Sequence, residues 1–96
     1  MPFEWDAAKA LANLARHGVD FEDAIRIFEN PTLEREDRRR AYGEARIQAL
    51  GRVGADVLFV MYVWRGTARR IISARGASRD EREAYRQAFP ISEGSD

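Results

Sequence analysis

The chain has 96 residues, 45% of them hydrophobic and 10% aromatic, and it contains no cysteine. These values suit one small domain with a packed core, and they exclude a disordered chain, disulfide bonds and thiolate metal sites. No apolar run approaches the roughly 20 residues that cross a bilayer, and the N-terminus lacks the pattern of a signal peptide. We therefore expect a cytoplasmic protein with a single domain over residues 1–96, its core in 3–89 and a flexible tail in 90–96.

Sixteen basic residues balance sixteen acidic ones, and a net charge of zero taken alone argues against a nucleic-acid-binding protein. The charges are unevenly distributed, however. The segment 46–79 contains seven arginines and a single acidic residue, Asp56. This segment predicts an electropositive surface that suits a phosphate-bearing partner. Lys9 is the only lysine among the sixteen basic residues. A genome rich in G and C explains this preference for arginine as well as a phosphate-bearing partner does.

The N-terminal third of the chain predicts two helices joined by a short turn. Asp6 caps a helix over 7–16, and Gly18 is placed for the left-handed residue that ends it. A second helix is expected over 20–28, because apolar residues recur there at intervals of three and four. We expect the two to form a helical hairpin. Residues 3–5 before them suit an edge strand or a plug under the core.

The middle of the chain predicts strands. Residues 32–40 suit a short exposed strand that leads into a loop. Apolar and polar residues alternate over 45–52, with Leu50 as the exception, and 57–64 is a continuous apolar run typical of a central strand. With the strand expected over 68–74, the short turns between these segments predict an antiparallel meander.

The last helix is expected to run from Arg79 to Phe89, because Ser78 and Glu81 form the sequence of a capping box and Pro90 ends the pattern. The elements together predict an α+β fold. In it the helical hairpin and the C-terminal helix pack on a small antiparallel sheet of three or four strands, and one face of the sheet stays free for a partner.

The junction between the last strand and the last helix is the first candidate site. Arg75 ends the strand and Arg79 lies on the first turn of the helix, where a scaffold commonly presents functional groups. Their guanidinium forks suit a phosphate, and we expect that of RNA. Arg70 lies an odd number of residues before Arg75, so strand alternation places the two on opposite faces unless a bulge intervenes. For each arginine the alternative is a solvated charge or a weak ion pair.

His17 is the only histidine, and a neutral imidazole is able to transfer a proton near pH 7. A histidine at a helix C-terminus also interacts favourably with the helix dipole, so a structural role is equally compatible with this position. Lys9 lies earlier on the same helix face, together with Asn13, and suits a contact with phosphate. Its alternative is an ordinary exposed lysine.

Tyr42, Glu44 and Arg46 share one face if the chain is extended there, and a phenol, a carboxylate and a guanidinium together suit nucleotide binding or acid–base chemistry. The same three residues are equally readable as a cross-strand salt bridge beside a packing tyrosine. Trp5 and Trp64 suit base stacking, or alternatively the core. One histidine and scattered carboxylates offer no metal-ligand spacing, so no metal or cofactor is predicted.

An ordered set of residues over 3–89 resembles the BrnT family of toxins. The set comprises FEWD (Phe3–Asp6), Lys9, Asn13, HGV (His17–Val19), Phe21, Ala24, Phe28, Pro31, Tyr42, Gly43, Glu44, Arg46, Gly51, RIISAR (Arg70–Arg75), Glu81, Arg82 and Tyr85. The resemblance implies a RelE-like fold and a ribonuclease toxin of a type II toxin–antitoxin module. It also implies a BrnA-like antitoxin that neutralises the toxin, with operator DNA bound only through the complex of the two.

The residues and the resemblance together predict a metal-independent endoribonuclease, in which the 2′-hydroxyl of RNA attacks the adjacent phosphate. Arg75 would stabilise the charge of the transition state. The expected proton-transfer residues are His17, Glu44 and Tyr42, and the expected RNA contacts are Lys9, Arg46, Arg70 and Arg79.

One position departs from the family pattern, since Gly76 stands where such proteins usually carry a second basic residue. This departure motivates an alternative function, a catalytically weak or inactive module that binds the antitoxin and acts as a co-repressor.

Overall fold

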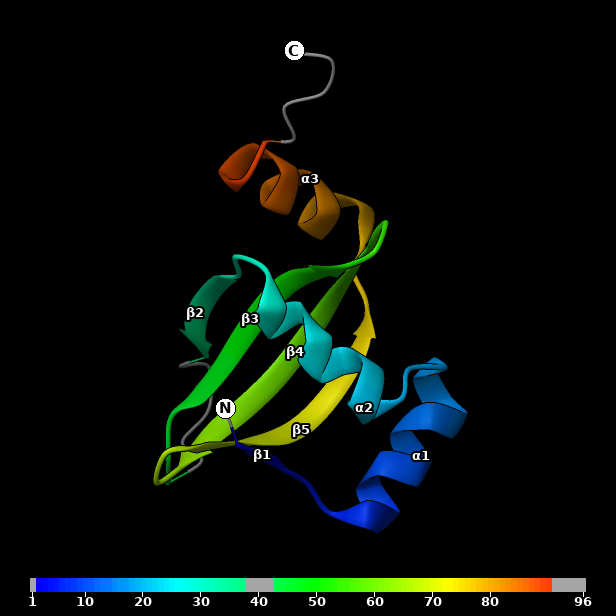
Figure 1. Cartoon of the computed structure of the whole chain (residues 1–96), viewed down its shortest axis with the longest axis vertical. Coiled ribbons are helices and arrows are strands. Elements are labelled where there is room, and N and C mark those ends of the chain that lie inside the picture. Colours follow the sequence, from blue (N-terminus) through cyan, green and yellow to red (C-terminus); the bar gives the residue numbers. More distant parts are fainter. Residues whose placement is uncertain (1, 38–42, 91–96) are drawn as a thin grey trace.

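The computed structural model describes residues 2–37 and 43–90, which form an α+β fold (Figure 1). The elements are β1 (Phe3–Glu4), α1 (Ala7–His17), α2 (Phe21–Ala24), the 3-10 helix η1 (Ile25–Glu29), β2 (Leu33–Asp37), β3 (Arg46–Val53), β4 (Asp56–Arg65), β5 (Ala68–Gly76) and α3 (Arg79–Ala88). None of the helices in this described part is long and apolar enough to cross a membrane. Residues 91–96 of the expected tail lie outside the described residues.

The sheet is larger than predicted and is mixed, with five strands in the order β1-β5-β4-β3-β2 among the described residues. The antiparallel meander of β3, β4 and β5 is confirmed. The prediction of three or four antiparallel strands was wrong, because β2 adds an antiparallel strand outside β3 and β1 pairs in parallel with β5. β1 is short and pairs with a strand at the other end of the chain, so its pairing depends on tertiary context rather than on local pattern.

The N-terminal helices differ in part from their prediction. α1 begins and ends as expected: Asp6 Oδ1 accepts from the Lys9 amide at 3.0 Å, and Gly18 has φ 72°. The second helix was expected to be continuous, but after α2 the chain tightens into η1 at the β-branched Ile25. The expected helical hairpin is not confirmed, and α1 and α2 each pack against β5.

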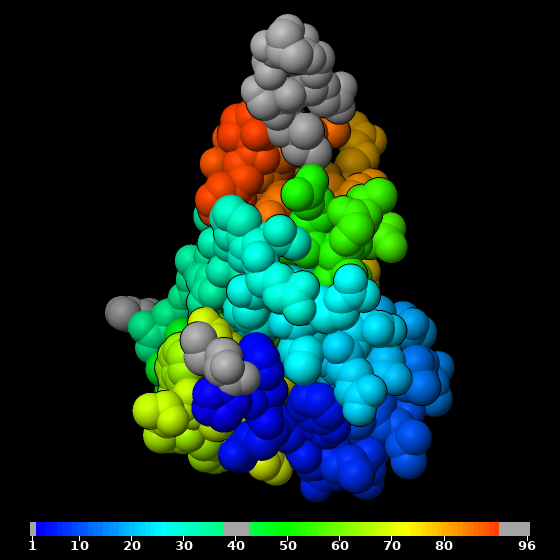
Figure 2. All heavy atoms as spheres, viewed as in Figure 1, coloured from blue at the N-terminus to red at the C-terminus, as the bar shows by residue number. Residues whose placement is uncertain are grey.

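The core lies between these helices and one face of the sheet. Figure 2 shows residues of β1, α1, α2 and η1, coloured blue to cyan, covering that face. The buried side chains of the core are Phe21, Ala24, Ile27, Ala49, Val60, Tyr62, Ile71 and Ala74. Gly51 allows η1 to lie directly on β3, because a Cβ at this position would lie 2.5 Å from the Cβ of Ile27.

The opposite face of the sheet, here called the open face, is covered by a described helix only at one end, by α3. The cross-strand register assigns to it Leu33, Arg35, Arg46, Gln48, Leu50, Arg52, Val57, Phe59, Met61, Val63, Arg70, Ser73 and Arg75. α3 is fixed over the end of this face in part by the Tyr85 hydroxyl, which donates to the Pro31 carbonyl at 2.7 Å. This face is not uniformly exposed, because Val63 and Gln48 on it are only 1% and 7% exposed, so a face free for a partner stays a prediction.

Asn13 attaches α1 to the edge of β5. Its Nδ2 donates to the carbonyls of Ala74 at 2.9 Å and Val19 at 3.0 Å, and its Oδ1 accepts from the Ala74 amide at 3.1 Å. Asn13 is buried, whereas Leu11 and Leu14 are 70% and 41% exposed. α1 therefore turns its polar side toward the sheet and its leucines toward solvent.

Candidate functional site

Arg75, near the end of β5, is oriented by Glu81 of α3. Its Nη1 and Nη2 donate to the two carboxylate oxygens of Glu81, each at 2.9 Å, and Nη1 also donates to the Gly76 carbonyl at 3.1 Å. The Arg75 Cζ lies 4.1 Å from the centre of the Phe59 ring. A carboxylate at one edge and an aromatic face beneath it therefore fix the guanidinium plane.

A second edge of the Arg75 guanidinium remains available. Among the described residues its Nε–H and its second Nη2–H have no partner, and the side chain is 38% exposed. These two donors point along the same edge of the fork, in the arrangement that binds two oxygens of a phosphate. Glu81 therefore orients Arg75 without occupying all of its donors.

Glu81 also joins Arg75 to the start of α3. Its Oε1 accepts from the Ser78 amide at 2.8 Å, and the Ser78 Oγ accepts from the Glu81 amide at 3.2 Å, which confirms the predicted capping box. The Arg75 guanidinium is the main cause that lowers the pKa of Glu81 from 4.5, against the opposing effect of burial. At neutral pH an ionised carboxylate thus holds the first turn of α3 against the end of β5.

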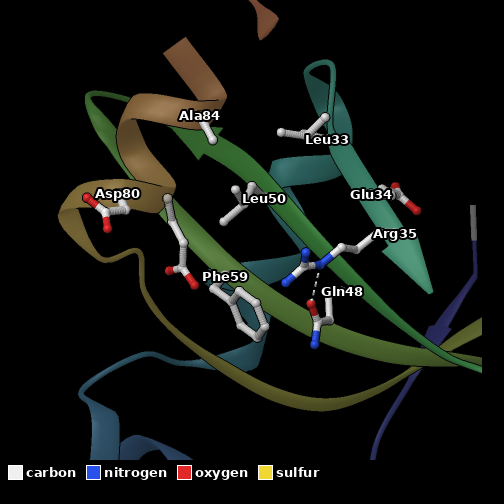
Figure 3. A pocket seen from close by; sticks show the side chains of 9 residues that line it. Leu33, Glu34, Arg35, Gln48, Leu50, Phe59, Asp80 and Ala84 are labelled. Carbon is white, nitrogen blue, oxygen red and sulfur yellow. Dashed lines mark hydrogen bonds between the residues drawn. The ribbon is translucent and has the colours of Figure 1, made fainter. Parts of the chain in front are cut away.

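A cleft of about 350 Å³ opens beside this ion pair, between the open face and α3 (Figure 3). Leu50 and Phe59 provide an apolar floor, Glu81 lies on the α3 side, and Arg35 of β2 lies on the opposite side. Leu50 is the residue that breaks the alternation of β3 in the sequence. The structure accounts for this exception, because the apolar side chain of Leu50 lies on the open face and lines the cleft.

Arg35 presents a second guanidinium to the cleft. Its Nε donates to Gln48 Oε1 at 2.9 Å, and Gln48 is only 7% exposed. This bond fixes the guanidinium, which Figure 3 shows directed into the cleft. Within the described part of the chain the two Nη groups have no partner. They are therefore available to a ligand.

Arg70 and Arg75 both lie on the open face, because the bulge that the alternation argument allowed for is present. The register with β4 shifts by one residue at Ile72, so β5 carries a bulge that reverses the alternation between the two arginines. They are still well separated, since five residues of strand span roughly 15 Å. Arg70 therefore does not join Arg75 at the cleft.

Glu44, Arg46 and Arg70 come together at the other end of the open face. Glu44 forms an ion pair with Arg65, which is the main cause that lowers the Glu44 pKa, and the charges of Arg46 and Arg70 lower it further. Arg70 Nη1 lies 3.0 Å from Oε2 of Glu4. This end of the face combines several guanidinium groups with the carboxylates of Glu4, Glu44 and Asp37, the last of which lies opposite Arg46 in the register, away from the cleft.

The remaining predicted site residues lie at the margins. His17 and Lys9 are exposed on α1, on the side that Asn13 attaches to β5, and so they lie near the edge of the sheet. Arg79 is exposed on the first turn of α3. Tyr42 lies outside the described residues.

The tryptophans take different positions. Trp5 packs edge-on against the core residue Phe21, with ring centres 5.9 Å apart, which agrees with its core alternative. Trp64 is 45% exposed, and the Arg69 Cζ lies 4.6 Å from its ring centre and 4.2 Å from that of Phe28. Arg69 is on the helix-covered side of the sheet, so this stacked group is separate from the cleft.

Sequence reasoning missed the cleft residues Phe59 and Arg35. It also missed that Glu81 pairs with Arg75. The presence of Glu81 was already explained by its role in capping the last helix, and that of Phe59 by its place in an apolar strand, so neither was considered as a site residue. The available signal was that β4 is apolar on both faces although a helix was expected on only one. No comparable signal marks Arg35, which lies in a uniformly charged segment.

Two further positions bear on the chemistry. In residues 2–37 and 43–90 no three His, Cys, Asp or Glu side chains gather as a metal site would require. At Gly76 an added Cβ would meet no atom within 4 Å. Space therefore does not explain why this chain lacks the second basic residue.

The model of the family "Ribonuclease toxin, BrnT, of type II toxin-antitoxin system" matches residues 5–81. Among solved structures, the chain is similar to the crystal structure of the Brucella abortus ribonuclease toxin BrnT, with 30% sequence identity and a TM-score of 0.63. The match covers 82% of this chain and 99% of that chain. No curated protein sequence matches. The family match ends in the first turn of α3, so most of this helix lies beyond it.

Proposed function

The chain belongs to the BrnT family of ribonuclease toxins of type II toxin–antitoxin systems, and from this premise we propose that it cleaves RNA at the mouth of the cleft, with Arg75 holding the reacting phosphate. The observation that carries the proposal is the orientation of Arg75. Its guanidinium is fixed by Glu81 and Phe59, yet keeps one edge for an anion. Preorganised donors of this kind stabilise charge that develops in a transition state.

The proposed reaction needs no metal ion. The 2′-hydroxyl of one nucleotide loses its proton and attacks the neighbouring phosphorus, the phosphorane-like transition state gains negative charge, and the 5′-oxygen leaves with a proton. Arg75 would bind two non-bridging oxygens through Nε–H and Nη2–H. Arg79, exposed on the next element, would contact an adjacent phosphate.

Among the candidates for proton transfer, His17 is the one whose helix contacts the strand carrying Arg75. Glu44 is paired with Arg65 at the far end of the open face, where Arg46 and Arg70 would anchor a more distant part of the RNA backbone. Tyr42 remains a candidate on sequence grounds alone. Lys9 would contact the backbone from α1.

Family membership implies an antitoxin partner, and a BrnA-like antitoxin would neutralise the protein, with operator DNA bound only through their complex. A RelE-like mode of action is part of the same proposal. The second candidate is a catalytically inactive antitoxin-binding module, favoured by Gly76. Expression without the antitoxin separates the two, because growth arrest with RNA cleavage requires the enzyme.

The direct test is cleavage of defined RNA in EDTA by wild type, Arg75→Ala, Arg75→Lys and the control Arg26→Ala. Arg26 is exposed on η1, on the helix-covered side. We expect Arg75→Ala to lose about 100-fold or more in rate, Arg75→Lys to lose less, and Arg26→Ala to match wild type. Circular dichroism confirms folding of each variant. Undiminished cleavage by folded Arg75→Ala would exclude the assignment, and dependence on a divalent ion would exclude the mechanism.

A further inference from the structure

The cleft beside Arg75 has the properties of a base-binding subsite. Its volume of about 350 Å³ exceeds what a single phosphate requires, and Leu50 and Phe59 form an apolar floor, with the Arg75 guanidinium over one face of the Phe59 ring. Stacking on such a surface stabilises a nucleobase whatever its identity. Glu81, which lines the cleft, is the residue that pairs with Arg75. A nucleotide with its base over the floor would extend its phosphate past Glu81 toward Arg75.

The two guanidinium groups approach this space from opposite strands. Three strand spacings separate β2 from β5, which places the backbones of Arg35 and Arg75 roughly 15 Å apart. Both side chains reach inward, since Arg35 bonds to Gln48 of β3 and Arg75 lies over Phe59 of β4. Arg35 and Glu81 line the cleft, and a nucleotide with its base at Arg35 would direct its phosphate past Glu81 toward Arg75.

The polar groups on the walls favour one kind of base. Arg35 offers the paired Nη donors of a guanidinium, held in place by Gln48. Paired donors match the O6 and N7 acceptors of guanine, whereas adenine presents a donor beside its N7. On the opposite wall, Oε2 of Glu81 accepts from Arg75 alone among the residues that the structure describes, and it retains a lone pair for an N–H of the base. Guanine has such N–H groups next to O6.

We propose that this cleft is a guanine-binding subsite, in which Arg35 reads the base and Phe59 and Leu50 stack on it. The inference rests on the proposed function, because Arg75 supplies the adjoining phosphate contact. It assigns Arg35 and Gln48 a role in specificity rather than in the chemical step. Gln48 is a positioning residue that acts by fixing the Arg35 plane.

The test uses 2′-O-methyl RNA hexamers that resist cleavage, UUGUUU, UUAUUU, UUCUUU and UUUUUU, with binding measured by fluorescence anisotropy. Wild type should bind the hexamer with guanine about tenfold more tightly than the others. Arg35→Ala should bind all four alike, and Gln48→Leu should reduce the preference. Arg26→Ala should retain it.

A second readout maps cleavage sites on unmodified RNA. Cuts adjacent to guanine in wild type should become independent of sequence in Arg35→Ala. Cleavage without base preference in wild type, or an unchanged preference in Arg35→Ala, overturns the subsite but leaves the nuclease intact. Absence of both RNA binding and cleavage overturns the proposed function as well. If Arg35→Ala instead loses only antitoxin capture and keeps its base preference, the cleft binds protein and the subsite is wrong.

Discussion

At the scale of single residues, Glu81 connects the catalytic role proposed for Arg75 to stability. Its carboxylate accepts from Arg75 and from the Ser78 amide, so one side chain both orients the proposed phosphate-binding group and caps α3. Glutamine in the same position keeps the cap, because its amide oxygen also accepts from the Ser78 amide, but it lacks the charge that pairs with Arg75. Glu81→Gln therefore separates the two roles.

The Glu81–Arg75 pair makes a pH-dependent contribution to stability. Because the folded protein lowers the pKa of Glu81 from 4.5, this contribution is present above the unfolded pKa and is lost as the pH falls through the lower, folded pKa. We expect Glu81→Gln to lower the free energy of unfolding at pH 7 by less than about 1 kcal/mol, since the pair is partly exposed. The difference from wild type should vanish in acid below the folded pKa.

Urea denaturation at both pH values measures this difference. Arg75→Gln should remove the same pH-dependent component, and the double variant should lose little beyond either single variant, because the two residues act as a pair. A loss from Glu81→Gln that is equal at both pH values would show that the ion pair contributes nothing to stability.

At the scale of elements, α1 depends on one side chain for its attachment. Asn13 provides both a donor and an acceptor to Ala74 at an edge of β5, and it is buried. Asn13→Ala would leave these backbone groups unsatisfied, and we expect a loss of about 1–3 kcal/mol in the free energy of unfolding. Leu11→Ala on the exposed side of the helix should cost less than about 0.5 kcal/mol. Equal losses in denaturant titrations would mean that α1 is held by its leucines instead.

The elements also show what the sequence was able to predict. Helix ends were predictable because Asp6, Gly18 and Ser78 act within one turn of chain. The bulge at Ile72 was not, because it exists only in the pairing of β5 with β4. The same reason explains why the pairing of the two edge strands was not predicted, although a strand was considered at both positions. Strand patterns record which residues face inward, but not the partner strand or its register.

The candidate site was predictable to a smaller extent. Arg75 was recognisable from its place at a strand end and from the family likeness. Its partner Glu81 and the cleft residues Arg35 and Phe59 were not, because they come from three separate elements that only the sheet brings together. Predicted residues near each other in the sequence, such as Glu44 and Arg46, did lie together, but away from Arg75.

At the scale of the whole molecule, the protein carries no net charge, so long-range attraction to RNA is weak and binding relies on local guanidinium groups. Each phosphate of a single-stranded RNA that the protein binds adds roughly −0.7 to the slope of the logarithm of affinity against the logarithm of salt concentration. With the proposed phosphate contacts of Arg75, Arg79, Arg46, Arg70 and Lys9, we expect a wild-type slope between about −0.7 and −3.5.

Anisotropy titrations of a 2′-O-methyl RNA at increasing KCl concentration measure this slope. Arg75→Ala should make it shallower by about 0.7, because one phosphate contact is lost. Arg35→Ala should weaken binding to guanine-containing RNA at every salt concentration and leave the slope almost unchanged, because a base contact releases no counterions. If Arg35→Ala changes the slope and Arg75→Ala does not, the two arginines have exchanged roles, and the phosphate lies on the β2 side of the cleft.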